Sequence, residues 1–267
     1  MTARRLSAVV PLFVVVWLGF AAASSADTIA FITSNRFHGA FVDYLADYGH
    51  DVRYLVVAGP NHDAPDLTLV DLRGVDTLLI ASNVPYARPA AVGNVAAAFA
   101  DTGRGVVLAY PSFQEPWNLD GRIMSSPYSP FTIGAADTFG EGDRIVVVDP
   151  TSPLFSGVDA ADILSTFKAD VHLVPGATLI AAWDSLIPAF AFNSLGRSRV
   201  VGLNLYPREE FAYNAATQRL ISNALFFANG NGPSPQTPEP STMLLVGAGA
   251  AAAALQRTRV ARRARSH

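Results

Sequence analysis

The residues best suited to covalent chemistry are few and lie far apart in the sequence. Ser112 follows the apolar run Gly105–Tyr110, and Glu115 lies three residues further on. A serine becomes a nucleophile only when a neighbouring base takes its proton, and His172 is the nearest plausible base. Ser112 is therefore either a nucleophile paired with His172 or a serine that satisfies a turn at a strand end. No motif brings the two together, so the second interpretation is favoured and we expect no catalytic residue.

The segment 111–134 (PSFQEPWNLDGRIMSSPYSPFTIG) is unusual because it contains four prolines and several aromatic residues. A long irregular segment in a compact domain is either functional or disordered, and the aromatic content argues against disorder. Aromatic faces beside amide groups suit carbohydrate, which makes Gln114, Trp117 and Tyr128 candidate ligand-binding residues. The same side chains would equally suit a loop that packs on the edge of a sheet.

Metal and cofactor chemistry have little support in the sequence. Asp63 and Asp66 lie three residues apart in the stretch NHDAPD and could contribute to a calcium site. The stretch lacks the ligand alternation of a known calcium loop, so we expect a solvated turn, no metal and no cofactor. The chain has no cysteine, which excludes thiol catalysis, thiolate metal sites and disulfide bonds.

The elements that would position these residues are short apolar runs alternating with helix-like stretches. Near-continuous apolar runs are typical of strands that are covered on both faces, as in a parallel sheet flanked by helices. The predicted strands are Thr28–Thr33, Val52–Ala58, Thr77–Ala81, Gly105–Tyr110, Arg144–Val148, Thr178–Trp183, Ala189–Phe192 and Arg199–Leu205. The predicted helices are His38–Tyr48, Pro89–Ala100 and Phe211–Ala228. This order predicts a layered α/β domain with a mostly parallel sheet, in which the later strands pair antiparallel.

Four stretches of this core resemble the class I glutamine amidotransferase-like fold, and within it the trehalose-utilisation-like branch. They are the opening strand and helix, LLIASN at 78–83, the helix leading into GVVLAYPSF at 105–113, and AAWDSLIPAFAFN with RVVGLNLYP between 181 and 207. The turn that begins at Asp149 resembles the Asp-His-Pro-Ile turn of that branch, with Thr151-Ser152 in place of the histidine. The resemblance implies a nucleophilic cysteine just after the strand GVVLAY. Here Pro111-Ser112 stands at that turn, so the implied thiol chemistry is out of reach.

The N-terminus has the three parts of a secretory signal peptide. Arg4 and Arg5 are followed by a nearly unbroken apolar run over residues 9–23 and then by small residues up to Ala26. A charged start, an apolar middle and a small-residue exit are typical of a cleavable signal. The apolar run is shorter than the roughly 20 residues that span a bilayer. We therefore interpret residues 1–26 as a signal peptide, and signal peptidase is an expected partner.

The C-terminus combines three features in a specific order. A linker rich in Gly, Pro, Asn and Ser covers residues 229–237, and an apolar run covers 242–255. The motif Pro238-Glu239-Pro240 stands before the apolar run, and arginines follow it at Arg257, Arg259, Arg262, Arg263 and Arg265. This order resembles the PEP-CTERM sorting signal of Gram-negative bacteria over residues 238–265. The resemblance implies recognition and processing by an exosortase, with 242–255 as a short transmembrane helix and the arginines on the cytoplasmic side.

The core between these ends covers residues 27–237, of which 27–228 form the globular α/β part. Its net charge limits the classes of partner that it can bind. The core holds 12 basic and 21 acidic residues, a net charge of −9, and nucleic-acid binding requires clustered basic residues. We therefore expect an exported protein, anchored transiently in the membrane and then held at the cell surface or in the extracellular matrix. Its core would be a non-catalytic binding or structural module, with extracellular polysaccharide as a possible partner. The alternative is a hydrolase or amidase of the same fold that uses Ser112 or a carboxylate such as Glu115.

The signal-peptide interpretation predicts that the exported protein begins near Asp27. The small residues that end at Ala26 provide the cleavage site, and N-terminal sequencing of the exported chain measures the position. A protein that retained Arg4 and Arg5 after export would contradict the prediction.

Overall fold

The computed structural model describes residues 26–35, 39–57, 59, 65–135, 143–163, 167–207 and 214–230. The predicted signal peptide, the sorting tail from Pro238 onward and Asp63 therefore lie outside the described residues. In the described ranges, no helix is both long enough and apolar enough to cross a bilayer. The predicted span at 242–255 falls in the part of the chain that is not described.

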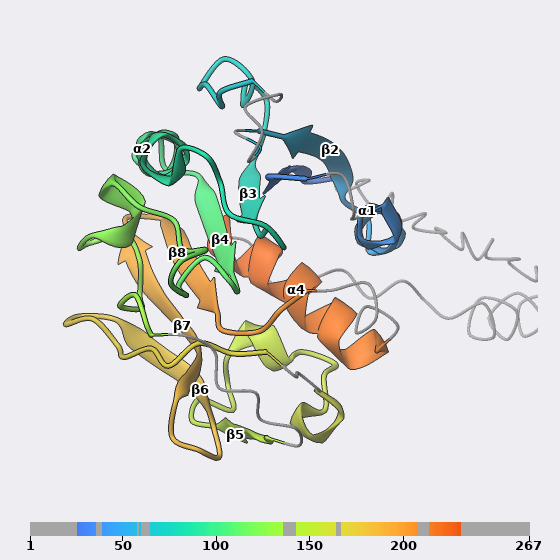
Figure 1. The fold of residues 1–267 in the computed structure, drawn as a ribbon. Coiled ribbons are helices and arrows are strands. Elements are labelled where there is room, and N and C mark those ends of the chain that lie inside the picture. The colour runs from blue at the N-terminus through green and yellow to red at the C-terminus, as the bar shows by residue number, and fades with distance from the viewer. Residues whose placement is uncertain are drawn as a thin grey trace, which may run out of the picture.

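One mixed sheet of eight strands forms the centre of the described core (Figure 1), in the order β2-β1-β3-β4-β8-β7-β6-β5. The first five strands in this order run parallel, and β7, β6 and β5 continue the sheet by antiparallel pairing. The strands are β1 (Thr28–Thr33), β2 (Asp51–Val56), β3 (Thr77–Ile80), β4 (Gly105–Ala109), β5 (Ile145–Val147), β6 (Thr178–Trp183), β7 (Pro188–Leu195) and β8 (Ser198–Leu203).

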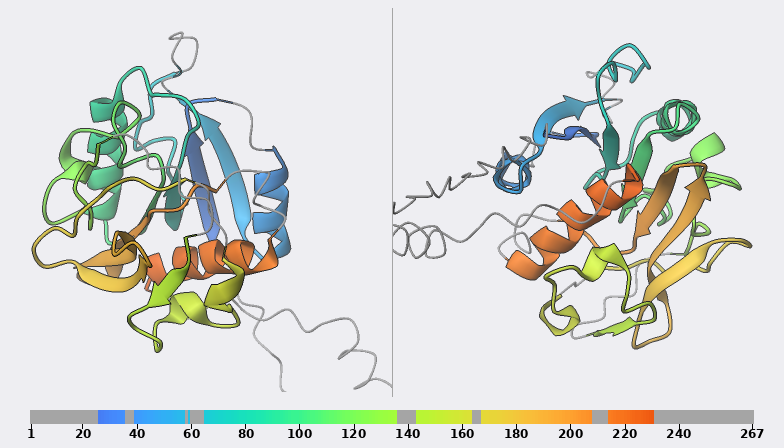
Figure 2. Two further views of the ribbon diagram at one scale, coloured as in Figure 1. Left: turned by 60° about the horizontal axis from the view of Figure 1, so that its bottom comes forward. Right: turned by 180° about the vertical axis from the view of Figure 1, so that it is seen from behind.

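Helices cover both faces of the sheet, which explains why its central strands are apolar on both sides. Helices α1 (Gly39–Asp47) and α4 (Ala215–Ala228) pack on one face, and α2 (Pro89–Ala100) packs on the other (Figure 2). Each residue of β3 and β4 is buried. Burying a large apolar side chain contributes roughly 1.5–3 kcal/mol, so this double cover supplies the main stabilisation of a core without disulfides. Three short 3-10 helices lie in the connections: η1 (Arg122–Met124), η2 (Pro153–Phe155) and η3 (Ala160–Asp162).

The predicted architecture is confirmed. All eight apolar runs contain strands, the later strands pair antiparallel, and β1, β6 and α2 have the predicted bounds. Pro89 occupies the start of α2, where a proline costs no helical hydrogen bond. The remaining boundaries shift by a few residues. The strand β7 is longer than its apolar run because Asn193 and Ser194 continue the ladder with β8.

The parallel strands give the sheet two distinct edges, an amino edge where they begin and a carboxyl edge where they end. Both ends of the described core lie at the amino edge. Asp27 precedes β1 and accepts a hydrogen bond from the backbone of Asp51. At the other end, α4 finishes against the first residue of β4, since a Cβ on Gly105 would lie 2.5 Å from the carbonyl carbon of Ala228. Glycine at position 105 thus allows the chain to leave the domain below β4.

A buried histidine lies between the two helices that share a face. His50 is 4% exposed, its Nε2 lies 2.8 Å from Ser222 Oγ, and its ring centroid lies 4.5 Å from that of Phe226. Its Nδ1 is buried and has no hydrogen-bond partner among the described residues. Burial lowers the pKa of His50 from 6.5 to about 4, because the charged imidazolium would lose its hydration.

We predict that His50 makes the core less stable in acid. The pKa of His50 is lower in the folded than in the unfolded state. Its contribution to the free energy of unfolding is therefore complete above pH 6.5 and is lost as the pH falls towards 4. The pKa difference corresponds to about 3 kcal/mol. Urea denaturation at pH 7 and pH 4.5 should show a smaller loss of stability in His50→Gln than in the wild type. His172→Gln, at an exposed histidine, is the control, and identical pH dependence in all three proteins would contradict the prediction.

Candidate functional site

The sheet has one position where neighbouring parallel strands lead to opposite faces. The chain leaves β1 towards α1 on one face, whereas it leaves β3 towards α2 on the other. In open α/β sheets such a topological switch point, at the carboxyl ends of the strands, is the usual place for a ligand. The candidate site is therefore the carboxyl edge between β1 and β3.

The same dipeptide, Ser-Asn, ends both strands at this point. We call Ser34, Asn35, Ser82 and Asn83 the switch-point group. The two serine hydroxyls contact each other, and both lie within hydrogen-bond distance of the carbonyl oxygen of Val84, at 2.7 Å and 2.8 Å. Both serines are buried, at 3% exposure. They join the ends of β1 and β3 below the two asparagines.

The asparagines of the switch-point group are partly exposed. The Asn35 amide nitrogen donates to the Asn83 carbonyl oxygen, and Tyr54 donates to the Asn35 backbone at 2.8 Å. The amide nitrogen of Asn83 has no protein acceptor among the described residues. Two N–H donors are therefore available to a ligand at this edge. These residues were not among the predicted site residues, although the repeated Ser-Asn pair directly after two apolar runs was a visible signal.

Ser112 lies at the carboxyl end of the next strand, β4, and is occupied by the fold. Its hydroxyl donates to the Ile80 carbonyl at 3.3 Å, and the residue is 3% exposed. Its backbone also bonds to Ala109 and Leu119. The side chain thus links β4 to the end of β3.

The other two candidate catalytic residues, Glu115 and His172, do not contribute to the hydrogen bonding of the Ser112 hydroxyl. Glu115 is exposed, and its backbone bonds to Gly134. His172 is also exposed, and its backbone N–H donates to Thr132 Oγ1 at 3.0 Å. Within the described ranges, no hydrogen bond joins Ser112 to either side chain. The described residues therefore bring neither Glu115 nor His172 into hydrogen-bond contact with the Ser112 hydroxyl.

Aromatic side chains fill the carboxyl edge between β4 and β8. The ring centroids of Tyr110, Phe167 and Tyr206 lie 5.7–6.3 Å apart in all three pairs. Gln114, a predicted ligand residue, is buried here and accepts a hydrogen bond from the Tyr110 hydroxyl. The space beside the turn that follows β4 is thus occupied by protein side chains.

Asn204 fixes the segment that brings Phe167 to this cluster. It is fully buried one residue after β8, and its carboxamide makes three hydrogen bonds. It accepts from the backbone N–H of Ala169 at 2.7 Å, and it donates to the carbonyls of Ala169 at 2.8 Å and Pro188 at 3.0 Å. The reciprocal pair with Ala169 pins residues 167–169 across the end of β8.

Lys168, in the segment 167–169, forms a buried ion pair with Asp143. The ammonium group also donates to Ser185 Oγ at 3.0 Å and lies 5.7 Å from the ring of Trp183. Lys168 is 5% exposed, so its charge is compensated within the protein. The sequence analysis did not assign it a role, although it is the single lysine of the chain.

The segment 111–134 packs against the sheet. Phe113, Leu119, Ile123 and Phe131 are all fully buried in the core on the α2 face. Trp117 lies at the surface, 36% exposed, and Ile133 nearby in the segment is 38% exposed. The three predicted ligand residues are thus separated: Gln114 is buried against Tyr110, Trp117 faces solvent and Tyr128 belongs to the contacts described next.

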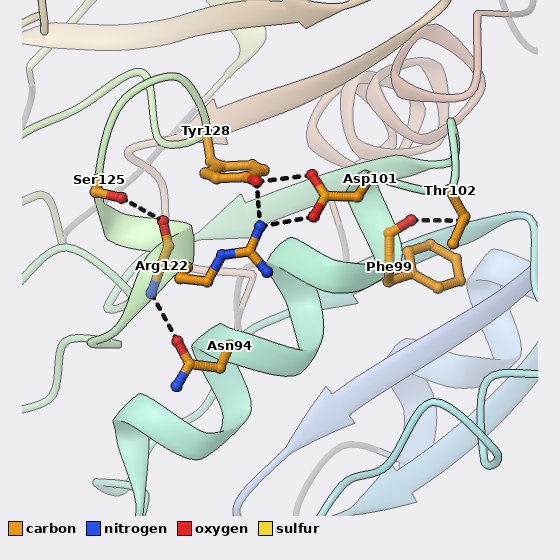
Figure 3. Close-up of polar contacts among 7 residues, drawn as sticks. All are labelled: Asn94, Phe99, Asp101, Thr102, Arg122, Ser125 and Tyr128. Carbon is orange, nitrogen blue, oxygen red and sulfur yellow. Dashed lines mark hydrogen bonds and ion pairs between the residues drawn. The ribbon is translucent and has the colours of Figure 1, made fainter.

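Figure 3 shows how Tyr128 is engaged at the C-terminal end of α2. Its hydroxyl donates to Asp101 at 2.7 Å, and Arg122 donates to both partners at 2.6 Å. The hydrogen bonds from Tyr128 and Arg122 hold the pKa of Asp101 below its usual value, and the bond to Asp101 raises the pKa of Tyr128. Because Asp101 and Arg122 are about half exposed, solvent screens the pair and its contribution to stability is small. These contacts hold the segment 111–134 against the C-terminal end of α2.

The described residues contain no group of three or more His, Cys, Asp or Glu side chains that could hold a metal ion. Asp66, from the predicted calcium loop, forms an exposed ion pair with Arg88 at 2.5 Å. Asp63 lies outside the described residues. The expectation of no metal site stays a prediction.

The tail can be compared with known sorting signals. Residues 236–259 match the PEP-CTERM protein-sorting motif. The chain carries a PEP-CTERM signal. This motif is the recognised signal of exosortase substrates and implies an exported protein sorted at the membrane. No curated protein matches the chain.

Solved structures share the fold of the core at low sequence identity. A cytoplasmic protein from Salmonella typhimurium is 12% identical, with a TM-score of 0.57 over 75% of this chain and 98% of that protein. A ThuA-like protein from Parabacteroides merdae is 12% identical, with a TM-score of 0.55 over 80% and 94% of the two chains. A GMP synthase component from Thermoplasma acidophilum has 13% identity and a TM-score of 0.50 over 75% and 93%. The fold is thus ThuA-like and glutamine amidotransferase-like, as the sequence resemblance implied.

We predict that Asn204→Ala destabilises the core by about 3 kcal/mol. The substitution leaves the backbone groups of Ala169 and Pro188 buried without partners, and each such group costs about 1–3 kcal/mol. Urea denaturation measures the change in the free energy of unfolding. Asn83→Ala, at a partly exposed carboxamide, is the matched control and should cost less than about 1 kcal/mol. Equal losses in the two variants would contradict the role given to Asn204.

Proposed function

We propose that this protein is an exosortase-processed surface protein whose core binds a neutral, hydroxyl-rich ligand without catalysis. The ligand class is polysaccharide of the cell surface or extracellular matrix. The binding site is the carboxyl edge at the switch-point group. The observation that carries the proposal is that the four side chains of the switch-point group are uncharged hydroxyl and carboxamide groups, and that the Asn83 amide nitrogen has no acceptor among the described residues.

The state of Ser112 supports a non-catalytic core. Its hydroxyl donates to the Ile80 carbonyl, whereas a nucleophilic serine must donate to a base. The turn that carries it holds no thiol, and the aromatic cluster of Tyr110, Phe167 and Tyr206 fills the space beside it. The alternative, a hydrolase that uses Ser112, requires a base that reaches this hydroxyl.

Charge and exposed surface support a neutral ligand. Among the described residues at this edge, the buried Lys168 is paired with Asp143, so its charge is compensated. Carboxamides match sugar hydroxyls because each offers both donors and acceptors. Trp117, in the segment that follows β4, adds an exposed aromatic face, which can stack on the apolar face of a sugar ring.

The tail supports the place of action. The PEP-CTERM motif follows a short linker after α4. In the proposed sequence of events, signal peptidase removes residues 1–26, the tail holds the protein transiently in the membrane, and exosortase releases it to the cell surface of a Gram-negative bacterium.

We predict that neutral polysaccharide retards the protein in affinity gel electrophoresis and that Asn83→Ala weakens the retardation. The probes are gels that contain dextran, a neutral glucan, or alginate, an acidic polysaccharide. Loss of a hydrogen bond worth about 1 kcal/mol corresponds to a dissociation constant that is about fivefold larger. Alginate should retard the wild type less than dextran does.

The matched control is Asn229→Ala, which removes a partly exposed asparagine from the opposite edge of the sheet and should leave the retardation unchanged. Absence of retardation by dextran, or equal effects of the two variants, would contradict the proposed site. Hydrolysis of ester or amide substrates that disappears in Ser112→Ala would replace the binding module with the serine hydrolase.

A further inference from the structure

The amino edge of the sheet is the edge from which both ends of the core leave. Asp27 stands directly before β1, and Asn229 and Gly230 follow α4 beside the first residue of β4. Gly230 packs against the β7–β8 hairpin, since a Cβ on it would lie 2.7 Å from the carbonyl oxygen of Arg197. The chain therefore leaves the described core at the edge opposite the switch-point group.

The covalent reach of the tail limits how the core can sit relative to the membrane. Eleven residues lie between Gly230 and Thr242, where the apolar run of the tail begins, and the twelve Cα–Cα steps span at most about 43 Å when fully extended. The six residues of β1 or β8 alone occupy about 20 Å, and turns extend beyond both ends. To turn the carboxyl edge towards the bilayer, the tail would have to run along the whole core, and the length of the strands alone takes about half of this reach.

Basic side chains surround the point where the tail leaves. Arg197 is exposed in the β7–β8 hairpin. Arg199 donates to the Phe227 carbonyl at 2.6 Å and lies 4.1 Å from the Phe227 ring, and Arg104 precedes β4. Asp27, Asp51 and Asp76 also stand at this edge, where β1, β2 and β3 begin. Asp76 accepts a hydrogen bond from Thr28 at 3.0 Å, and Asp101 is paired with Arg122. The basic side chains are therefore confined to the side of the edge at β4 and β8. The arginines can thus face anionic lipid headgroups.

We infer that the tail holds the amino edge of the sheet against the membrane surface, with Arg197 towards anionic headgroups, and that the carboxyl edge faces away. The inference rests on the anchoring of the tail that the proposed function includes. It implies that the core displays the switch-point group outward while the protein is still attached to the membrane.

The chain has no cysteine, so a single introduced thiol reports one position. Arg197→Cys and Arg144→Cys form a matched pair, because each replaces an exposed arginine beside a strand, at the amino edge and the carboxyl edge respectively. The protein is exported from a host without exosortase, purified with its tail intact and labelled with a thiol-reactive fluorophore. It is then bound to vesicles of phosphatidylcholine and phosphatidylglycerol that carry nitroxide headgroups. Equal thermal midpoints of the two variants and the wild type check the fold.

The label at position 197 should be quenched at least twofold more strongly than the label at position 144. Equal quenching, or stronger quenching at 144, would overturn the orientation. Removal of Pro238–His267 should abolish quenching at both positions, and quenching that persisted would show that the tail is not the cause. Failure of the intact chain to co-sediment with the vesicles would refute the anchoring itself, a result distinct from binding in the wrong orientation.

Discussion

The arrangement of this core depends on β8, the strand that joins the parallel part of the sheet to its antiparallel part. It pairs in parallel with β4 on one side and antiparallel with β7 on the other, so the two parts of the fold meet along a single strand. Asn204 ends this junction and links its backbone to the segment 167–169 through buried hydrogen bonds. At Gly202 a Cβ would lie 2.6 Å from the Phe131 ring, so the segment 111–134 can pack directly on the strand. The aromatic cluster and the Lys168–Asp143 pair both follow from this anchoring.

A fold shared with amidotransferase-like proteins does not by itself carry their chemistry. One fold hosts many functions because the site residues vary on a constant scaffold. In this chain the serine hydroxyl at the turn after β4 makes a structural bond between strands. The same carboxyl edge, at the ends of β1 and β3, carries uncharged donors and acceptors next to a pair of buried serines. Catalysis of acyl transfer needs a group that changes its protonation state, whereas recognition of sugar hydroxyls does not.

Local sequence was sufficient for the fold and insufficient for the site. The runs Thr28–Thr33 and Thr178–Trp183 predict their strands because backbone burial on both faces demands continuous apolar residues. The contacts of Tyr128 with Asp101 and Arg122, in contrast, join α2 to a later segment, and no local pattern encodes such a meeting. Gln114 and Trp117 are three residues apart, yet one is buried and the other is at the surface. The switch-point group needed the strand order, which places β1 beside β3 rather than beside β2 alone.

The burial of Lys168 has a practical consequence for handling the protein. It is the single lysine of the chain, and its amine is held in an ion pair with Asp143. Amine-reactive coupling near neutral pH therefore has one accessible target, the α-amine, whose pKa is also lower than that of a lysine. In the proposed mature chain, which begins near Asp27, that amine stands beside the first strand at the amino edge. A chip or bead coupled in this way would carry every molecule with its carboxyl edge towards the solution.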